Sequence, residues 1–213
     1  MKQTIFIALA IFTSFVSRGQ AKGTNLFDLN WGPGSTISNS FVSGFATKGG
    51  DIGYSYFIKK DLSVGIDLGW NNYWKYAPTA TYDFKSGAAT TDLYKYIFTL
   101  PIRANVTRYF HVGKLFSPYV KTGFGAEYSE QNLYYNVFET THSNWGFVTN
   151  SEVGVKISPA PYSPFAFNLG FRYQYATNSV PQYNINHMQA YNVIFGVSWR
   201  MALLLSLLLL LFR

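Results

Sequence analysis

The amino-acid sequence predicts an all-β fold, an eight-stranded antiparallel transmembrane β-barrel with an up-and-down meander topology. Three observations predict it. Apolar residues alternate with small or polar residues, eight separate segments carry this alternation, and charged residues amount to only 13% of the composition. Because soluble domains carry about 25% charged residues, much of the surface of this protein is expected to face something other than water.

The composition fits one domain of 213 residues. Aromatic residues reach 19%, whereas the mean hydropathy lies near zero, which excludes a helical membrane bundle. The chain contains no cysteine, so neither disulfides nor thiolate chemistry contributes. We also expect no nucleic-acid partner, because the one tight basic cluster, Lys59 and Lys60, is followed at once by Asp61.

Residues 1–19 have the pattern of a secretory signal peptide. Lys2 precedes an apolar stretch from Ile5 to Val16, and small residues follow at Ser17 and Gly19. An uncleaved anchor helix is the alternative, but this stretch would extend only about 18 Å, well short of a hydrocarbon core of roughly 30 Å. We therefore expect cleavage after Gly19 and a barrel domain over residues 20–200, with 15 basic and 10 acidic residues in the mature chain.

Period-two alternation is clearest over residues 62–71 and 165–176, where one face is apolar and the other is small or polar. The same template predicts eight strands, an even number as barrels of this kind require: 24–32, 49–58, 62–73, 93–108, 117–128, 145–158, 164–176 and 189–200. Three connections are short: 59–61, 109–116 and 159–163. The connections that start at Pro33, Trp74, Ser129 and Thr177 are longer and are expected to be loops on the opposite rim.

The direction of the two faces separates a membrane barrel from a soluble, lipocalin-like barrel. A water-facing surface would carry many Lys and Glu residues, yet the polar positions are mostly Gly, Ser, Thr and Asn. Small residues suit the crowded interior of an eight-stranded barrel, so the apolar face is expected to contact lipid. Aromatic residues near the strand ends are expected to form interfacial girdles: Trp31, Trp70, Tyr73, Tyr128, Trp145 and Trp199.

The ordered set of strand motifs resembles the small outer-membrane β-barrel domain proteins that are common in Bacteroidetes. The resemblance lies in residues 54–65, in 118–125, in 144–155 and in Phe167 to Tyr175. Its pieces are generic strand sequences, but their order and spacing agree over most of residues 24–200. It implies location in the outer membrane of a Gram-negative cell and an eight-stranded barrel. Members of this family mostly lack an assigned molecular activity.

The chain continues beyond the predicted last strand, where a typical barrel ends on an aromatic residue such as Trp199. Residues 201–213 are rich in leucine, show no alternation and are too short to span a bilayer as a helix. This apolar tail is either a non-native extension, which the change in composition favours, or an interfacial segment.

Candidate catalytic and metal-binding residues are few. His111, His142 and His187 have no ligand spacing typical of a metal site. His142 and Ser143 next to Glu139 invite a nucleophile interpretation, but neighbours in a flexible loop are a poor frame for a triad. The sequence therefore predicts no enzyme, no cofactor and no metal.

Charged residues at polar strand positions are the candidate site. Asp67 is expected to face Arg103 on the next strand, and antiparallel counting puts Glu152 between Lys121 and Arg172. A buried charge without a partner costs several kcal/mol, so these residues are predicted to form a structural network in the lumen; a narrow ion path is the alternative. The full predicted network is Asp67, Arg103, Lys121, Glu127, Glu152 and Arg172.

These observations predict a monomer with a structural, envelope-integrity or surface-binding role. The alternatives are a small passive pore and a lipid-modifying outer-membrane enzyme. The expected partners are outer-membrane lipid and, through the loops, an envelope protein or an extracellular ligand.

Overall fold

The computed structural model describes residues 22–37, 41–84, 87–110, 112, 114–161 and 163–202. The predicted signal peptide and residues 203–213 of the predicted tail lie outside these ranges. No helix in them is long and apolar enough to cross a membrane.

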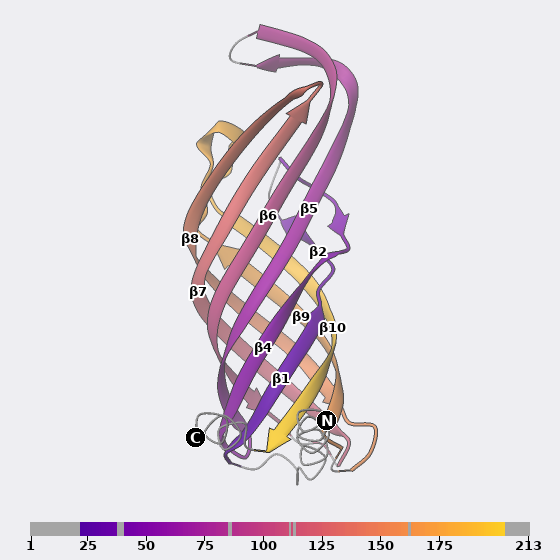
Figure 1. The fold of residues 1–213 in the computed structure, drawn as a ribbon, viewed down its shortest axis with the longest axis vertical. Coiled ribbons are helices and arrows are strands. Elements are labelled where there is room, and N and C mark those ends of the chain that lie inside the picture. The colour runs from indigo at the N-terminus through magenta and orange to yellow at the C-terminus, as the bar shows by residue number, and fades with distance from the viewer. Residues whose placement is uncertain are drawn as a thin grey trace, which may run out of the picture.

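Eight antiparallel strands form a closed ring in sequence order (Figure 1). Each strand pairs with its neighbours, and the last pairs with the first from Ala202 opposite Thr24 to Phe195 opposite Trp31. The predicted eight-stranded meander is thereby confirmed, although the last strand continues two residues past Arg200. The strands of the ring are β1 (Thr24–Trp31), β4 (Lys48–Lys59), β5 (Leu62–Phe84), β6 (Gly87–Tyr109), β7 (Phe116–Tyr135), β8 (Phe138–Ile157), β9 (Phe165–Ala176) and β10 (Met188–Ala202).

Two short strands and a 3-10 turn lie in the connections at one rim. After β1, Pro33 interrupts the pairing because proline has no N–H to donate. The chain then resumes along β10 as β2 (Gly34–Ile37), and β3 (Phe45–Ala46) pairs with β2. The connection between β9 and β10 contains the 3-10 turn η1 (Pro181–Tyr183).

The apolar face of the strands points outward and the polar face points into the barrel. On β5, the side chain of Ile66 is 57% exposed, whereas that of its neighbour Asp67 is 0% exposed. This polarity is that of a barrel in lipid, as the scarcity of charges predicts. The prediction was wrong for Tyr73, which is not part of a girdle: it is 2% exposed and belongs to an apolar cluster inside the barrel.

Two of the four predicted long loops are strands instead. The residues that follow Trp74 and Ser129 continue β5 and β7, and the strands return as β6 and β8, so that two hairpins rise beyond the rest of the ring (Figure 1). Cross-strand aromatic pairs support the longer hairpin, with Trp74 opposite Tyr96 and Tyr76 opposite Tyr94. β5 continues for 12 residues past its last partner in β4, which corresponds to about 40 Å of extended chain.

The longer hairpin bends near its end, as Figure 1 shows above the labels β5 and β6. The register between the two strands shifts between Ala77 and Ala80. Pro78 lies within this irregularity and has no N–H for the ladder, and a bulge of this kind bends a strand. We attribute the bend to it.

Candidate functional site: the barrel interior and the extended outer sheet

All six predicted network residues are buried inside the barrel, each at most 4% exposed. Their burial follows from period-two alternation, because each occupies an inward position of its strand. The barrel interior also contains four buried charged residues that sequence reasoning missed, Asp28, Asp51, Lys156 and Arg200. Among the described residues, five acids and five bases are buried: Asp28, Asp51, Asp67, Glu127 and Glu152, with Arg103, Lys121, Lys156, Arg172 and Arg200.

Arg172 on β9 is the centre of the network. Its Nη1 atom lies 2.7 Å from Oδ2 of Asp51 on β4, across the lumen. Its Nε atom donates to Oε2 of Glu152, the neighbouring residue on β8, over 2.7 Å. One guanidinium thus connects two carboxylates on strands that are not neighbours, and such charge-assisted bonds are among the stronger hydrogen bonds in proteins.

The second oxygen of Glu152 accepts a hydrogen bond from the hydroxyl of Tyr119 over 2.7 Å. Tyr119 lies inward on β7 and reaches across two glycines, Gly154 and Gly170, which are cross-strand partners on β8 and β9. A Cβ atom at Gly154 would lie 2.7 Å from the Tyr119 ring. Glycine is therefore required there so that the phenol can reach the carboxylate.

Lys121 and Arg103 have partners that strand counting did not predict. Lys121 lies opposite Glu152 in register, but its Nζ atom donates to Asp67 on β5 over 3.2 Å. Asp67 lies opposite Arg103 in register, whereas Nη1 of Arg103 donates to Oε1 of Gln174 on β9 over 2.6 Å. The amide of Gln174 in turn donates to Oε2 of Glu127 over 2.5 Å.

Lys156 lies at the end of the network that is nearest the short turns. Its Nζ atom donates to Asp28, Asn168 and Ser198 over 2.7, 3.2 and 2.6 Å. Asn168 then bonds to Asn30 over 2.9 Å, and Asn30 bonds to Asp51 over 3.0 Å. Polar contacts therefore continue from Lys156 to Arg172. Lys156 and Asp28 were missed, although both stand at polar positions between apolar residues.

An apolar plug lies inside the barrel at the rim with the long connections. Phe41 and Val42 from the β1–β4 connection, and Val180 and Ile185 from the β9–β10 connection, pack against inward residues of the wall. The ring of Phe41 stacks on Tyr183 with centroids 4.2 Å apart. Both connections therefore fold into the mouth of the barrel.

A second apolar cluster lies inside the opposite end. Leu26, Phe57, Tyr109 and Tyr119 come from four strands and are each at most 3% exposed. The rings of Phe57 and Tyr109 lie 5.2 Å apart, and those of Tyr109 and Tyr119 lie 6.0 Å apart. The charge network thus lies between two apolar clusters.

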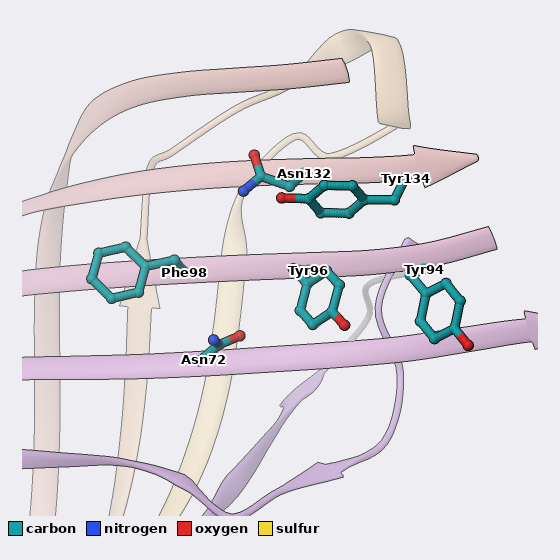
Figure 2. Close-up of a pocket in the computed structure, with 6 residues that line it drawn as sticks. All are labelled: Asn72, Tyr94, Tyr96, Phe98, Asn132 and Tyr134. Carbon is teal, nitrogen blue, oxygen red and sulfur yellow. The ribbon is translucent and has the colours of Figure 1, made fainter. Parts of the chain in front are cut away.

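The outward face of the extended hairpins carries a groove of about 540 Å³. Figure 2 shows its side chains projecting from three adjacent strands, four aromatic rings with an amide on either side. The lining residues are Asn72 on β5, Tyr94, Tyr96 and Phe98 on β6, and Asn132 and Tyr134 on β7. This groove was not predicted from the sequence, because the residues that follow Trp74 and Ser129 were expected to form loops.

The candidate catalytic residues do not come together. His142 and Ser143 are consecutive in β8, so their side chains lie on opposite faces of the sheet. The His142 ring contacts Tyr183 with centroids 5.3 Å apart, and His187 lies 2.8 Å from the amide of Gln189. His111 lies outside the described residues, and within those residues no group of three potential metal ligands occurs.

Comparisons with known proteins agree with this architecture. The family model for the outer membrane protein beta-barrel domain matches residues 4–200. No curated protein matches. Among solved structures, Neisserial surface protein A is similar at 16% identity and a TM-score of 0.52, over 84% of this chain and 97% of that chain. The attachment invasion locus protein of Yersinia pestis, in complex with a heparin analogue, is similar at 13% identity and a TM-score of 0.49, over 84% and 99%. The outer membrane protease of Escherichia coli is similar at 7% identity and a TM-score of 0.46, over 88% and 99%.

Proposed function

Because this chain belongs to the outer membrane protein beta-barrel domain family, we propose that it is a closed barrel that displays a rigid extracellular sheet for binding at the cell surface. The family confirms the predicted outer-membrane location. Since barrels of this membrane have short periplasmic turns, the extended hairpins lie on the outer side of the cell.

The filled interior is the observation that carries the proposal. Five acids and five bases are buried there, and four ion pairs of 2.6 to 3.2 Å connect seven of them. Apolar clusters lie at both ends of this network. An eight-stranded barrel has an interior just wide enough for side chains, which supports a structural network over an ion path.

The extended hairpins support surface display. A strand that leaves the membrane normally gives way to a loop, whereas β5 to β8 continue as a paired sheet with outward aromatic rings. Paired strands hold side chains in fixed positions. Less conformational entropy of the protein is therefore lost when a ligand binds to them. The separation of His142 from Ser143 supports this role over an enzymatic one.

The closed interior predicts the absence of ion conductance. Purified protein added to a planar lipid bilayer is expected to give no steps above the baseline of the bare membrane, because no continuous water path passes the two clusters. A porin fused into the same bilayer shows that inserted barrels are detected. Reproducible steps from this protein alone would mean that it is a passive pore.

Surface display is tested by removing the outer parts of the two extended hairpins, the extension, while keeping the parts of the eight strands that cross the membrane, the membrane belt. In a shortened variant, residues 72–98 and 130–143 are each replaced by a two-residue Asn-Gly turn, which joins residues that already face each other in register. Cells with equal amounts of either form in the outer membrane are applied to an array of immobilised proteins and glycans. We expect retention of cells with the full chain and loss of retention with the shortened variant. Equal retention, or none with the full chain, would contradict the proposal.

A further inference from the structure

We propose that the outward groove over β5, β6 and β7 binds an uncharged glycan chain from outside the cell. This inference rests on the proposed surface-binding function and names the ligand class for it. It stands on the shape of the groove, on its side chains and on the charges around it.

The groove has the size and the mixed lining of a ligand site. Its volume of about 540 Å³ lies within the usual range of roughly 300 to 1,000 Å³. The four aromatic rings offer flat apolar surfaces, while three phenols and two amides offer hydrogen-bond donors and acceptors. A sugar ring presents both matching surfaces: its C–H face packs on an aromatic ring, whose face carries negative charge, and its hydroxyl edge bonds to amides and phenols.

The rings are arranged as a row that suits a chain rather than one small molecule. Tyr94, Tyr96 and Phe98 alternate along β6, so their Cα atoms are spaced by about 6.6 Å, and Figure 2 shows them in sequence on one strand. Beside the row, the Tyr134 ring lies 5.7 Å from the Tyr96 ring at an interplanar angle of 85°, and the Tyr76 ring lies 4.9 Å from the Tyr94 ring at 49°. The flat surfaces for consecutive sugar units are therefore those along β6, and the neighbouring rings form the sides of the groove.

The charges at the groove favour an uncharged ligand. Glu130 accepts a hydrogen bond from the lining residue Asn132 over 2.9 Å, and Glu139 lies opposite Tyr134 in register. Lys75 and Lys95 occupy the alternate face of their strands, whereas the exposed Lys48 on β4 lies opposite the lining residue Asn72, on the same face of the sheet. The Lys95 Nζ atom lies 5.3 Å from the ring of the plug residue Phe41. A sulfated or phosphorylated glycan would thus meet two carboxylates beside β7 against Lys48 beside β5, so these charges give it no net attraction.

The other occupants fit less well. Acyl chains are disfavoured because amides stand at either side of the groove, and an amide in hydrocarbon without a partner is costly. A peptide strand cannot add to β6, because β6 already pairs with β5 and β7. The membrane's own lipopolysaccharide carries phosphate on the sugars nearest its lipid anchor, which the two carboxylates disfavour.

The experiment uses the full chain, refolded in a zwitterionic detergent without a sugar headgroup. Dextran and dextran sulfate form a matched pair that differs in charge, and maltohexaose, cellohexaose and mannohexaose extend the uncharged set. Binding is measured by titration calorimetry. We expect at least one uncharged glycan to bind, and dextran sulfate to bind no better than dextran.

The groove variants are Tyr94→Ala and Tyr96→Ala. Each should weaken binding of the uncharged glycan about tenfold or more, because each removes an aromatic side chain from the centre of the contact. Phe138→Ala is the matched control, because Phe138 is an exposed aromatic residue of the extension that does not line the groove. It should leave affinity unchanged. A heat-modifiable gel shift establishes that each variant is folded.

Several outcomes would overturn the inference. They are the absence of binding to every uncharged glycan, tighter binding of dextran sulfate or of lipopolysaccharide micelles, and equal affinities of the groove and control variants. A change in sedimentation of Tyr96→Ala without a change in glycan affinity would mean that the groove is an interface between copies. If cells are retained on immobilised proteins but not on glycans, the surface-binding function holds and the glycan assignment fails.

Discussion

Replacing Arg172 by methionine is expected to destabilise the folded barrel by about 3 to 5 kcal/mol, the usual cost of breaking a buried ion pair by removing one partner. Arg172 bonds to both Asp51 and Glu152. Its removal leaves two carboxylates buried with less positive charge nearby. The free energy of unfolding is measured by urea titration of the refolded protein in lipid vesicles, followed by heat-modifiable gel shift.

The matched control for this prediction is the triple variant Arg172→Met, Asp51→Asn and Glu152→Gln. It removes the carboxylates together with their partner, so most of the lost stability should return. A double-mutant cycle between Glu152 and Arg172 should show strong coupling. The cycle between Glu152 and Lys121 should show less, because Lys121 donates to Asp67. Additive effects at Glu152 and Arg172 would mean that their contact contributes nothing to stability.

Replacing Leu169 by arginine is expected to reduce stability by about 2 to 4 kcal/mol, the cost of a cation on the lipid face near the bilayer midplane. Leu169 lies at the middle of β9, its side chain is 45% exposed, and its register partners are the outward residues Val155 and Phe195. The measurement is again urea titration in vesicles.

Val137→Arg provides the control for the lipid face. Val137 is 85% exposed at the end of the β7–β8 hairpin, where an arginine would meet water. Its stability should remain within about 0.5 kcal/mol of the original protein, as is usual for surface substitutions. If both arginine variants behaved alike, the outward face of β9 would not lie in hydrocarbon.

The membrane belt could be predicted from the sequence because its rule is local. Each residue of a strand faces lipid or lumen in turn, so the alternation of Leu62 to Trp70 gives the strand, and the scarcity of charges at the polar positions gives the face that points inward. The hairpin extensions were missed because this contrast disappears above the lipid. There, Trp74, Tyr76 and Tyr94 face outward among Asn and Glu residues, and both faces of the sheet have a mixed composition.

The sequence predicted which residues belong to the network better than it predicted which of them bond to each other. Counting along antiparallel strands gives directly opposite residues, and it puts Arg172 beside Glu152, which do bond. It cannot give a contact across the lumen, such as Lys121 with Asp67 or Lys156 with Asp28. Such contacts depend on the diameter of the closed ring, on strand tilt and on side-chain length.

The sequence by itself therefore determined the barrel, the number of its strands, the direction of their faces and the burial of six charged residues. All of these follow from a period of two and from the cost of placing charge in lipid. Only the tertiary structure decided which charges meet, how the connections fill the mouth and where the aromatic groove lies. These features join residues distant in sequence, and their geometry exists only after the ring has closed.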